Sequence, residues 1–508
     1  MKKRNIPAVP LLAGLSLCML SSGAFAQKEA DRVKMEHAQI GIVEDKTSGY
    51  THTTHPDARW FPQAGLGMFL HWGISTLKEK DLSWPMMAGT QIGWRAANNR
   101  LDSAEVRKIM ESGDYFAGHA CQKDNSCITP NEYWALAKDF QPKSYDPEKW
   151  VKAAKEAGMT YVVFTTRHHD GFALWPSAYG NFNTKNYMGG RDLVKNYVAA
   201  CRKYGLKVGL YYSGPDWYFN RDFQSFMYYG VSRSYPNIPS LDANLQPRKT
   251  EKTEAEKQAH YHKVAAYIKG QVEELLTNYG RIDMIWFDGA PDIPKGHPAW
   301  KECISMDRIR QLQPGIIVSP RFFGYGDYKT FESDKNAPTT LQDGWAEFCT
   351  TSTQSGWAYT PAPMKSSAHL LNYLVKCRSL NTNMLLNFGP TKEGELTPEM
   401  YDRLNDIAGW MKVNGAAIRG ARALEAPETA SVPATAANHH RYLFVLPKQG
   451  TPAGEETVVF QTPEAIQAVR LLGRREKLFY TVQCGTLTVR VPAAVRTPLG
   501  EVIDVTLK

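Results

Sequence analysis

Polar residues that can do chemistry directly follow short apolar runs at six places in this 508-residue chain. The groups are imidazoles, a phenol, a carboxylate, a guanidinium and an amide, which together can bind hydroxyls, hold charge and transfer protons. At the carboxyl ends of parallel strands such groups meet in one place. The sequence therefore predicts one site built from His71, His168, His169, Tyr212, Asp288, Arg321 and Asn387.

Asp288 is the strongest candidate for a reacting carboxylate. It ends the segment Asp283-Met-Ile-Trp-Phe-Asp-Gly289, where alternation along a strand puts Trp286 and Asp288 on the same side. One interpretation is an ionised carboxylate held against a bound sugar beside an aromatic wall. The other is a helix N-cap after the strand. The segment alone supports both equally.

A second carboxylate is required if the chain hydrolyses glycosides by the retaining route, in which one carboxylate attacks and another protonates the leaving oxygen. Glu332 and Glu347 are the candidates, although each is equally compatible with a surface position. The retaining route predicts a separation from Asp288 of about 5 to 5.5 Å.

The adjacent histidines His168 and His169, together with His71, suit either a metal site or hydrogen bonding to sugar hydroxyls. Neighbouring side chains on a strand point in opposite directions, so both can converge only beyond the strand end. The sequence has no His-Glu-x-x-His or Cys-x-x-Cys motif. We therefore favour sugar binding and expect no metal and no cofactor.

The elements that must position these residues alternate between apolar runs and amphipathic helices from about residue 60 to 420. Continuous apolar runs of this kind are typical of strands buried on both faces, and the alternation predicts a (β/α)₈ barrel, an α/β fold. Helices are expected at 146–158, 254–279 and 397–414. Strands are expected at 67–72, 161–166, 208–212, 284–287, 316–318 and 384–388, with two more near residues 328 and 345.

The pattern changes after Arg419. Residues 421–438 are rich in Ala, Pro, Thr and Glu, which suits a linker, and short β-rich runs follow it. We expect a catalytic barrel over residues 27–420 and a small all-β sandwich domain over 421–508. Packing against the barrel is the favoured role of that second domain, with sugar binding as the alternative.

The motifs of the barrel region resemble those of the α-L-fucosidases of glycoside hydrolase family 29, over about residues 58 to 420. The double histidine is the most specific of them. The resemblance implies a barrel followed by a β-sandwich. The matching stretches are 65–73, 161–172, 208–213, 285–289, 385–390 and 410–415.

The resemblance also implies roles for individual residues. Asp288 corresponds to the family's nucleophile, Glu332 to the acid/base of some members, and Glu347 to the glutamate of a Trp-Glu motif in others, here with Ala346 inserted. We favour Glu332 and keep both. Residues that correspond to the lining of the fucose site are His71, His168, His169, Tyr212, Trp286 and Arg321.

One stretch departs from the family. Many members carry Glu-Trp in the loop after the first strand, where the glutamate contacts the sugar, and this chain has Ser83-Trp84-Pro85. Trp84 stays a predicted sugar contact, but a hydroxyl that needs an anionic acceptor loses it. The expected activity is release of α-L-fucose from a fucosylated oligosaccharide or glycoconjugate. A hydrolase of a related L-sugar such as L-galactose, and a non-catalytic sugar-binding barrel, remain alternatives.

The first 26 residues read as a signal peptide, with a basic start, an apolar stretch and the small residues Ala24 and Ala26 before the expected cleavage site. This predicts export to the periplasm or the extracellular space. Cys121 and Cys127 could then form a disulfide, for which the spacing is permissive but not decisive.

The formal net charge of +9 is mild for this length, and no basic run interleaved with aromatics suggests nucleic acid binding. No membrane span is expected, and the oligomeric state is open.

Overall fold

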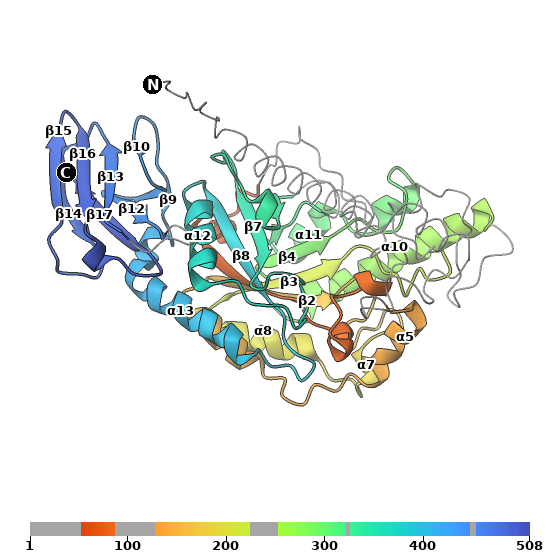
Figure 1. Cartoon of the computed structure of the whole chain (residues 1–508). Coiled ribbons are helices and arrows are strands. Elements are labelled where there is room, and N and C mark those ends of the chain that lie inside the picture. The colour runs from red at the N-terminus through yellow and green to blue at the C-terminus, as the bar shows by residue number, and fades with distance from the viewer. Residues whose placement is uncertain (1–51, 87–127, 224–251, 322–325, 448–453) are drawn as a thin grey trace, which may run out of the picture.

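The computed structural model describes residues 52–86, 128–223, 252–321, 326–447 and 454–508. Most of the chain forms an α/β region, and the C-terminal strands lie at one end of this region, on the left in Figure 1. The predicted signal peptide and both Cys121 and Cys127 fall outside the described residues.

Eight parallel strands form one curled sheet in the order β5-β4-β3-β2-β1-β8-β7-β6. Most are buried on both faces, which explains their continuous apolar sequences. The expected α/β barrel architecture is confirmed, including the two strands expected near residues 328 and 345. The strands are β1 Leu66–Leu70, β2 Tyr161–Arg167, β3 Lys207–Ser213, β4 Met284–Asp288, β5 Ile317–Val318, β6 Lys329–Glu332, β7 Ala346–Thr351 and β8 Thr382–Phe388.

A single aspartate joins the two ends of this sheet. The backbone N–H of Asp327 donates to the carbonyl of Val318 at 2.9 Å, and its carboxylate accepts from the backbone N–H of Val318 at 2.8 Å. These bonds link β5 to the residues just before β6, where the described residues show no strand ladder. The side chain thus replaces a missing strand pairing and brings the ends of β5 and β6 together.

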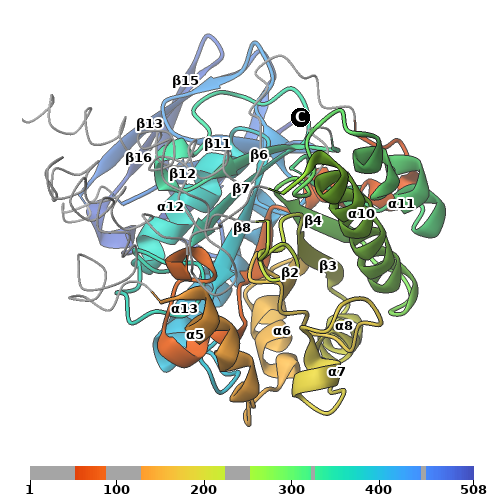
Figure 2. The same ribbon diagram turned by 90° about the vertical axis from the view of Figure 1, so that its right-hand side faces the viewer.

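Helices cover the outside of the sheet (Figure 2). Helix α6 starts where the sequence predicts, because Asp146 caps the backbone N–H of Glu148 and Pro147 takes the first helical position. Helix α10 starts with a capping box between Thr253 and Glu256. The helices are α5 Pro130–Ala135, α6 Pro147–Glu156, α7 Thr184–Tyr187, α8 Leu193–Lys203, α10 Glu254–Thr277, α11 Met306–Leu312, α12 Ser367–Arg378 and α13 Pro398–Asn414.

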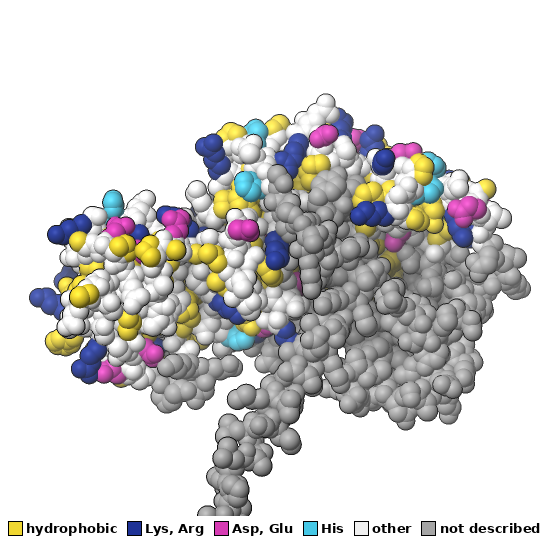
Figure 3. Space-filling model, turned by 90° about the horizontal axis from the view of Figure 1, so that it is seen from above, with side chains coloured by type: hydrophobic (Ala, Val, Ile, Leu, Met, Phe, Trp, Pro, Cys, Tyr) yellow, Lys and Arg dark blue, Asp and Glu magenta, His cyan; other side chains and the backbone are white. Residues whose placement is uncertain are grey.

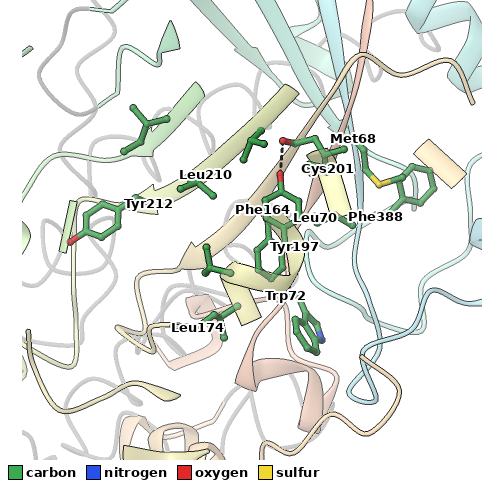
Figure 4. Packing of buried hydrophobic residues seen from close by; sticks show 14 of the residues in the cluster. Met68, Leu70, Trp72, Phe164, Leu174, Tyr197, Cys201, Leu210, Tyr212 and Phe388 are labelled. Atoms are coloured by element: carbon green, nitrogen blue, oxygen red, sulfur yellow. Dashed lines mark hydrogen bonds between the residues drawn. The ribbon is translucent and has the colours of Figure 1, made fainter. Parts of the chain in front are cut away.

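Two layers of apolar side chains lie on the two faces of the sheet. The outer layer packs against the helices and includes Phe164, Tyr197, Leu210 and Tyr212 (Figure 4). The inner layer fills the barrel and includes Tyr211 and other aromatic side chains. Consecutive residues of β3 therefore belong to different layers, which decides which of them reaches the site.

The C-terminal region is all β, as expected, with two antiparallel sheets. Its first strands lie within residues 421–438, so the interpretation of that segment as a linker is wrong. Small residues there pair with β12 and leave little apolar pattern in the sequence. The strands are β9 Arg422–Ala423, β10 Thr429–Ala430, β11 Ala434–Ala437, β12 His440–Val445, β13 Glu456–Gln461, β14 Ile466–Leu471, β15 Phe479–Gln483, β16 Thr486–Val491 and β17 Glu501–Leu507.

The C-terminal sheets pack on α13 and the turn that follows it. The indole N–H of Trp410 donates to the carbonyl of Gly500 at 3.2 Å, and the hydroxyl of Thr435 donates to the carbonyl of Ala417 at 2.8 Å. Phe444 and Val502 are buried in the same apolar layer as the barrel helices. This region is thus joined to the barrel by a continuous core.

The described surface in Figure 3 mixes positive, negative and hydrophobic side chains. Within the described residues, no helix combines the length and the apolar character that crossing a membrane requires.

Candidate active site

Asp288 is the last residue of β4, at the carboxyl end of the barrel, and its side chain is 12% exposed. The hydroxyl of Tyr211 donates to its Oδ2 at 2.7 Å, and Nη1 of Arg321 donates to its Oδ1 at 3.1 Å. The next helical turn along the chain starts only at Pro298, so Asp288 is not an N-cap. Its two oxygens instead accept charge-stabilising bonds, as a carboxylate poised to react requires.

Glu332 shares the guanidinium of Arg321 with Asp288. Nη2 of Arg321 donates to Oε2 of Glu332 at 2.5 Å, while Nη1 bonds Asp288. Burial opposes the charge of Arg321, but the carboxylates of Glu332 and Asp288 outweigh it and raise the pKa of Arg321 above its usual value. One fixed cation therefore holds two carboxylates at the same end of the barrel.

Glu347 lies elsewhere, in the second position of β7 and fully buried. Its carboxylate accepts bonds from the hydroxyl of Tyr161 at 2.6 Å and from the indole N–H of Trp286 at 2.8 Å. Burial raises the pKa of Glu347 to about 7, against the opposing effect of these hydrogen bonds. The structure places this glutamate inside the barrel beneath Trp286, not beside Asp288.

Trp286 lies between Glu347, inside the barrel, and Arg321, which is bonded to Asp288. Its ring lies under the guanidinium of Arg321, 4.7 Å from the carbon of that group, and stacks on Tyr211 with ring centroids 5.7 Å apart. The predicted placement of Trp286 on the same side as Asp288 is thus what the structure has. A cation over an indole face is favourable, so Trp286 helps to hold Arg321 in place.

His71 follows β1 and is buried. Its Nδ1 lies 2.7 Å from Oδ1 of Asn387, at the end of β8, and its ring is 5.0 Å from the ring of Trp357. Burial lowers the pKa of His71 to about 4, although the bond to Asn387 opposes this. The imidazole is therefore neutral near pH 7, which suits a hydrogen-bonding role toward hydroxyls.

The two adjacent histidines converge beyond the end of β2, with ring centroids 4.1 Å apart. Nδ1 of His168 lies 2.5 Å from the hydroxyl of Ser83, and Nδ1 of His169 bonds the hydroxyl of Ser213. Nε2 of His169 is 3.8 Å from Oδ2 of Asp288. Burial lowers the pKa of His169 to about 4 and that of His168 well below its usual value. Both are neutral and one faces the candidate nucleophile.

Tyr212 does not lie with the other predicted site residues. Its hydroxyl donates to Gln271 at 3.1 Å, and the guanidinium of Arg167 lies 4.2 Å from its ring centroid, both on the helix-facing side of β3. Tyr211 takes the predicted place beside Asp288. Leu210, Tyr211 and Tyr212 are all apolar or aromatic, so these residues alone do not show which side of the strand faces inward.

Trp84 lies in a short helical turn, Trp84–Met86, beside the histidines. Its ring is perpendicular to that of His169, with centroids 5.4 Å apart, and is 5.5 Å from the ring of Trp217. Ser83, the residue before Trp84, is fully buried and bonded to His168 and to the backbone N–H of Asp170. The structure thus adds Tyr211, Ser83, Ser213 and Trp357 to the predicted site.

A metal ion is geometrically possible at His168, His169 and Asp288, whose ligand atoms lie within 4.8 Å of one another. The electrostatics oppose one, because Arg321 already puts a positive charge against Asp288. The same groups satisfy the needs of a bound polyol, which donates to neutral imidazoles and accepts from a guanidinium.

The chain is similar to known α-L-fucosidases. The family model described as alpha-L-fucosidase matches residues 43–416. The tissue alpha-L-fucosidase of Rattus norvegicus is 29% identical over 378 residues, covering 72% of this chain and 70% of the relative, and that of Homo sapiens is 27% identical with the same coverage. The solved structure of alpha-L-fucosidase isoenzyme 1 from Paenibacillus thiaminolyticus has a TM-score of 0.67 at 27% identity, covering 89% of this chain and 99% of that one.

Proposed function

The chain belongs to the α-L-fucosidase family, and on that premise we propose that it is a retaining exo-glycosidase that releases terminal α-L-fucose from glycans. The observation that carries the proposal is the shared guanidinium of Arg321, which bonds Asp288 and Glu332 at the carboxyl end of the barrel. Retaining hydrolysis needs two carboxylates in fixed relation, and this contact supplies that relation.

In the first step, a carboxylate oxygen of Asp288 attacks the anomeric carbon while Glu332, in its protonated form, gives its proton to the departing glycosidic oxygen. The products of this step are a fucosyl ester of Asp288 and a free hydroxyl on the leaving glycan. Tyr211 and Arg321 both bond the attacking carboxylate, so they set its orientation before the attack.

In the second step, Glu332 removes a proton from water, which attacks the anomeric carbon and releases fucose with its original configuration. Esterification has then removed the negative charge of Asp288. Arg321 is left with Glu332 as its anionic partner, which favours the deprotonated glutamate that the water attack requires.

The neutral histidines contribute recognition. His71, His168 and His169 exchange hydrogen bonds with the ring hydroxyls, and Trp84 and Trp286 provide apolar surface for the sugar ring. Ser83 stands where many family members have glutamate, and its oxygen is engaged by His168 and Asp170. L-fucose and L-galactose are therefore both to be tested.

We also propose that residues 1–26 direct export to the periplasm or outside the cell, on the strength of the basic, apolar and small-residue pattern. N-terminal sequencing of the mature protein is expected to begin at Gln27. A mature protein that begins at Met1 contradicts this.

The experiment that tests the activity is hydrolysis of nitrophenyl α-L-fucoside and α-L-galactoside, with the product anomer followed by NMR. The proposal expects faster release from the fucoside and a first product of α configuration. Faster release from the galactoside assigns a different L-sugar, a first product of β configuration excludes retention, and sugar binding without release from either makes the chain a binding protein.

Azide distinguishes the two carboxylates. With Asp288→Ala, azide is expected to occupy the vacated face and give a fucosyl azide of inverted configuration. With Glu332→Ala, azide is expected to attack the fucosyl ester on Asp288 and give the retained configuration. Unchanged turnover in Asp288→Ala contradicts the assignment of Asp288 as the nucleophile.

A further inference from the structure

We propose that Ser213 locks His169 in the tautomer that carries its proton on Nδ1, so that Nε2 accepts a hydrogen bond from a substrate hydroxyl beside the nucleophile. The inference deepens the proposed function and rests on it for the identity of the sugar. It makes Ser213 a positioning residue that determines the direction of a hydrogen bond.

The tautomer of His169 is fixed because the Ser213 hydroxyl has a single proton. This hydroxyl donates to the carbonyl of Pro215 at 2.8 Å, and a carbonyl can only accept. The same oxygen bonds Nδ1 of His169. Because its proton is already used, Ser213 can only accept in this second bond, and the proton between them belongs to Nδ1 of His169.

The other ring nitrogen is then an acceptor. His169 is fully buried, and burial keeps it neutral by lowering its pKa to about 4, so only one of its nitrogens carries a proton. Nε2 has no hydrogen-bond partner among the described residues. A buried nitrogen lone pair without a partner is costly, and a donor from the substrate satisfies it.

The contact with Asp288 agrees with this tautomer. Nε2 of His169 lies 3.8 Å from Oδ2 of Asp288, beyond hydrogen-bond distance. A proton on Nε2 would face this carboxylate, and a small movement would let it add a third hydrogen bond to Asp288, which already accepts from Tyr211 and Arg321. Oδ2 instead accepts from Tyr211 at 2.7 Å. By denying Nε2 a proton, Ser213 keeps His169 from competing for the nucleophile.

A second histidine is held in the same tautomer by a different device. The side-chain amide N–H of Asn387 donates to the carbonyl of Trp357 at 2.7 Å, which fixes the amide so that its oxygen faces His71. That oxygen lies 2.7 Å from Nδ1 of His71, which must therefore carry the proton. Two imidazoles of the site thus offer Nε2 as an acceptor.

The chemical consequence is a requirement for a free hydroxyl. The sugar position that meets His169 must donate a proton, so a deoxy, fluoro or O-methyl group there leaves Nε2 unpaired. Analogues with fluorine or hydrogen at such a position are expected to bind equally weakly, because neither atom donates a hydrogen bond. At a position that accepts from the protein, fluorine retains part of the interaction and hydrogen does not.

The test in binding uses L-fucose and its 2-, 3- and 4-deoxy and deoxyfluoro analogues as competitive inhibitors. In the wild-type enzyme, one position is expected to lose roughly 5- to 100-fold in affinity, equally for hydrogen and fluorine. In Ser213→Ala the fluoro analogue is expected to bind better than the deoxy analogue at that position, because His169 is free to carry its proton on Nε2 and to donate to fluorine. Ser213→Thr, which keeps the hydroxyl, is expected to restore the wild-type pattern. If the fluoro analogue binds better than the deoxy analogue at all three positions in the wild-type enzyme, the proposal is overturned.

The test in structure is ¹⁵N NMR of the histidine side chains in the full chain without substrate, with the His169 signal assigned by its loss in His169→Gln. The expected wild-type spectrum shows a protonated Nδ1 and an unprotonated Nε2 from pH 5.5 to 8. Ser213→Ala is expected to shift His169 toward the other tautomer, while Ser83→Ala, the matched change beside His168, leaves it in place. A wild-type His169 with its proton on Nε2, or no change in Ser213→Ala, contradicts the proposal. This measurement needs no turnover, so it remains decisive if the fucoside is not hydrolysed.

Discussion

Glu347 accepts a hydrogen bond of 2.8 Å from the indole N–H of Trp286, inside the barrel. Asp288, two residues after Trp286, ends the same strand, whereas Glu347 stands near the start of its own. All eight strands are parallel, so the two carboxylates belong to different ends of the barrel. Glu332 ends β6 and shares Arg321 with Asp288, which makes it the better acid/base of the two glutamates.

Replacing each glutamate by glutamine separates their roles. Glu332→Gln is expected to reduce kcat/KM about 10²- to 10⁴-fold for a fucoside with a poor leaving group, because general acid catalysis is lost. With a nitrophenyl leaving group the first step is expected to suffer much less, and the fucosyl enzyme accumulates. Glu347→Gln is expected to keep the same ratio of rates for good and poor leaving groups as the wild type. A leaving-group dependence that appears in Glu347→Gln and not in Glu332→Gln reverses the assignment.

Glu347 is also expected to make stability depend on pH with a defined sign. Burial raises its pKa to about 7 in the folded protein, from the usual 4.5. Between about pH 4.5 and 7 the folded protein keeps a proton that the unfolded chain releases. The free energy of unfolding therefore falls as pH rises, by up to about 1.4 kcal/mol per pH unit from this group.

Denaturant unfolding of the wild type and Glu347→Gln at pH 5 and pH 7 measures this contribution. Glutamine does not titrate, so the stability advantage of the wild type over the variant is expected to be greatest near pH 5 and to shrink by pH 7. Comparing the two proteins cancels the contributions of other buried groups, including the histidines, whose lowered pKa values act in the opposite direction. An advantage that is constant or grows toward pH 7 contradicts the raised pKa of Glu347.

Adjacent tyrosines of β3 provide a matched pair of substitutions. Tyr211→Phe removes a hydroxyl that donates 2.7 Å to Asp288, and is expected to lower kcat/KM roughly ten- to hundredfold, as for loss of a bond to a charged group. Tyr212→Phe removes a bond to Gln271 on the helix side, and is expected to lower stability by about 1 kcal/mol with kcat/KM nearly unchanged. If Tyr212→Phe costs more activity than Tyr211→Phe, the side-chain arrangement at the end of β3 is not the one described.

The sequence was sufficient to predict the barrel, because strands buried on both faces leave continuous apolar runs and polar residues mark their ends. It identified Asp288, Glu332 and Arg321 as site residues but not the bond that joins them, since the contact depends on how β4, β5 and β6 curl together. It could not decide between Tyr211 and Tyr212, because a strand buried on both faces shows no period of two.

Other features needed the structure for different physical reasons. Ser213 acts through the carbonyl of Pro215, a backbone group that carries no sequence signal. Residues 421–438 resemble a linker because their strands are two to four residues long and rich in alanine. Strands β10 and β11 are stabilised by pairing with β13 and β12, which lie later in the chain, and β9 pairs with β11.

The most direct test of the central claim is to trap the bond between Asp288 and the sugar. A 2-deoxy-2-fluoro-α-L-fucosyl substrate with a reactive leaving group forms the ester quickly and hydrolyses it slowly, so the labelled enzyme can be digested and analysed by mass spectrometry. The account predicts one labelled peptide, with the fluorofucosyl group on Asp288 and none in Asp288→Asn. A label on any other residue, or an active enzyme that never carries a label, contradicts it.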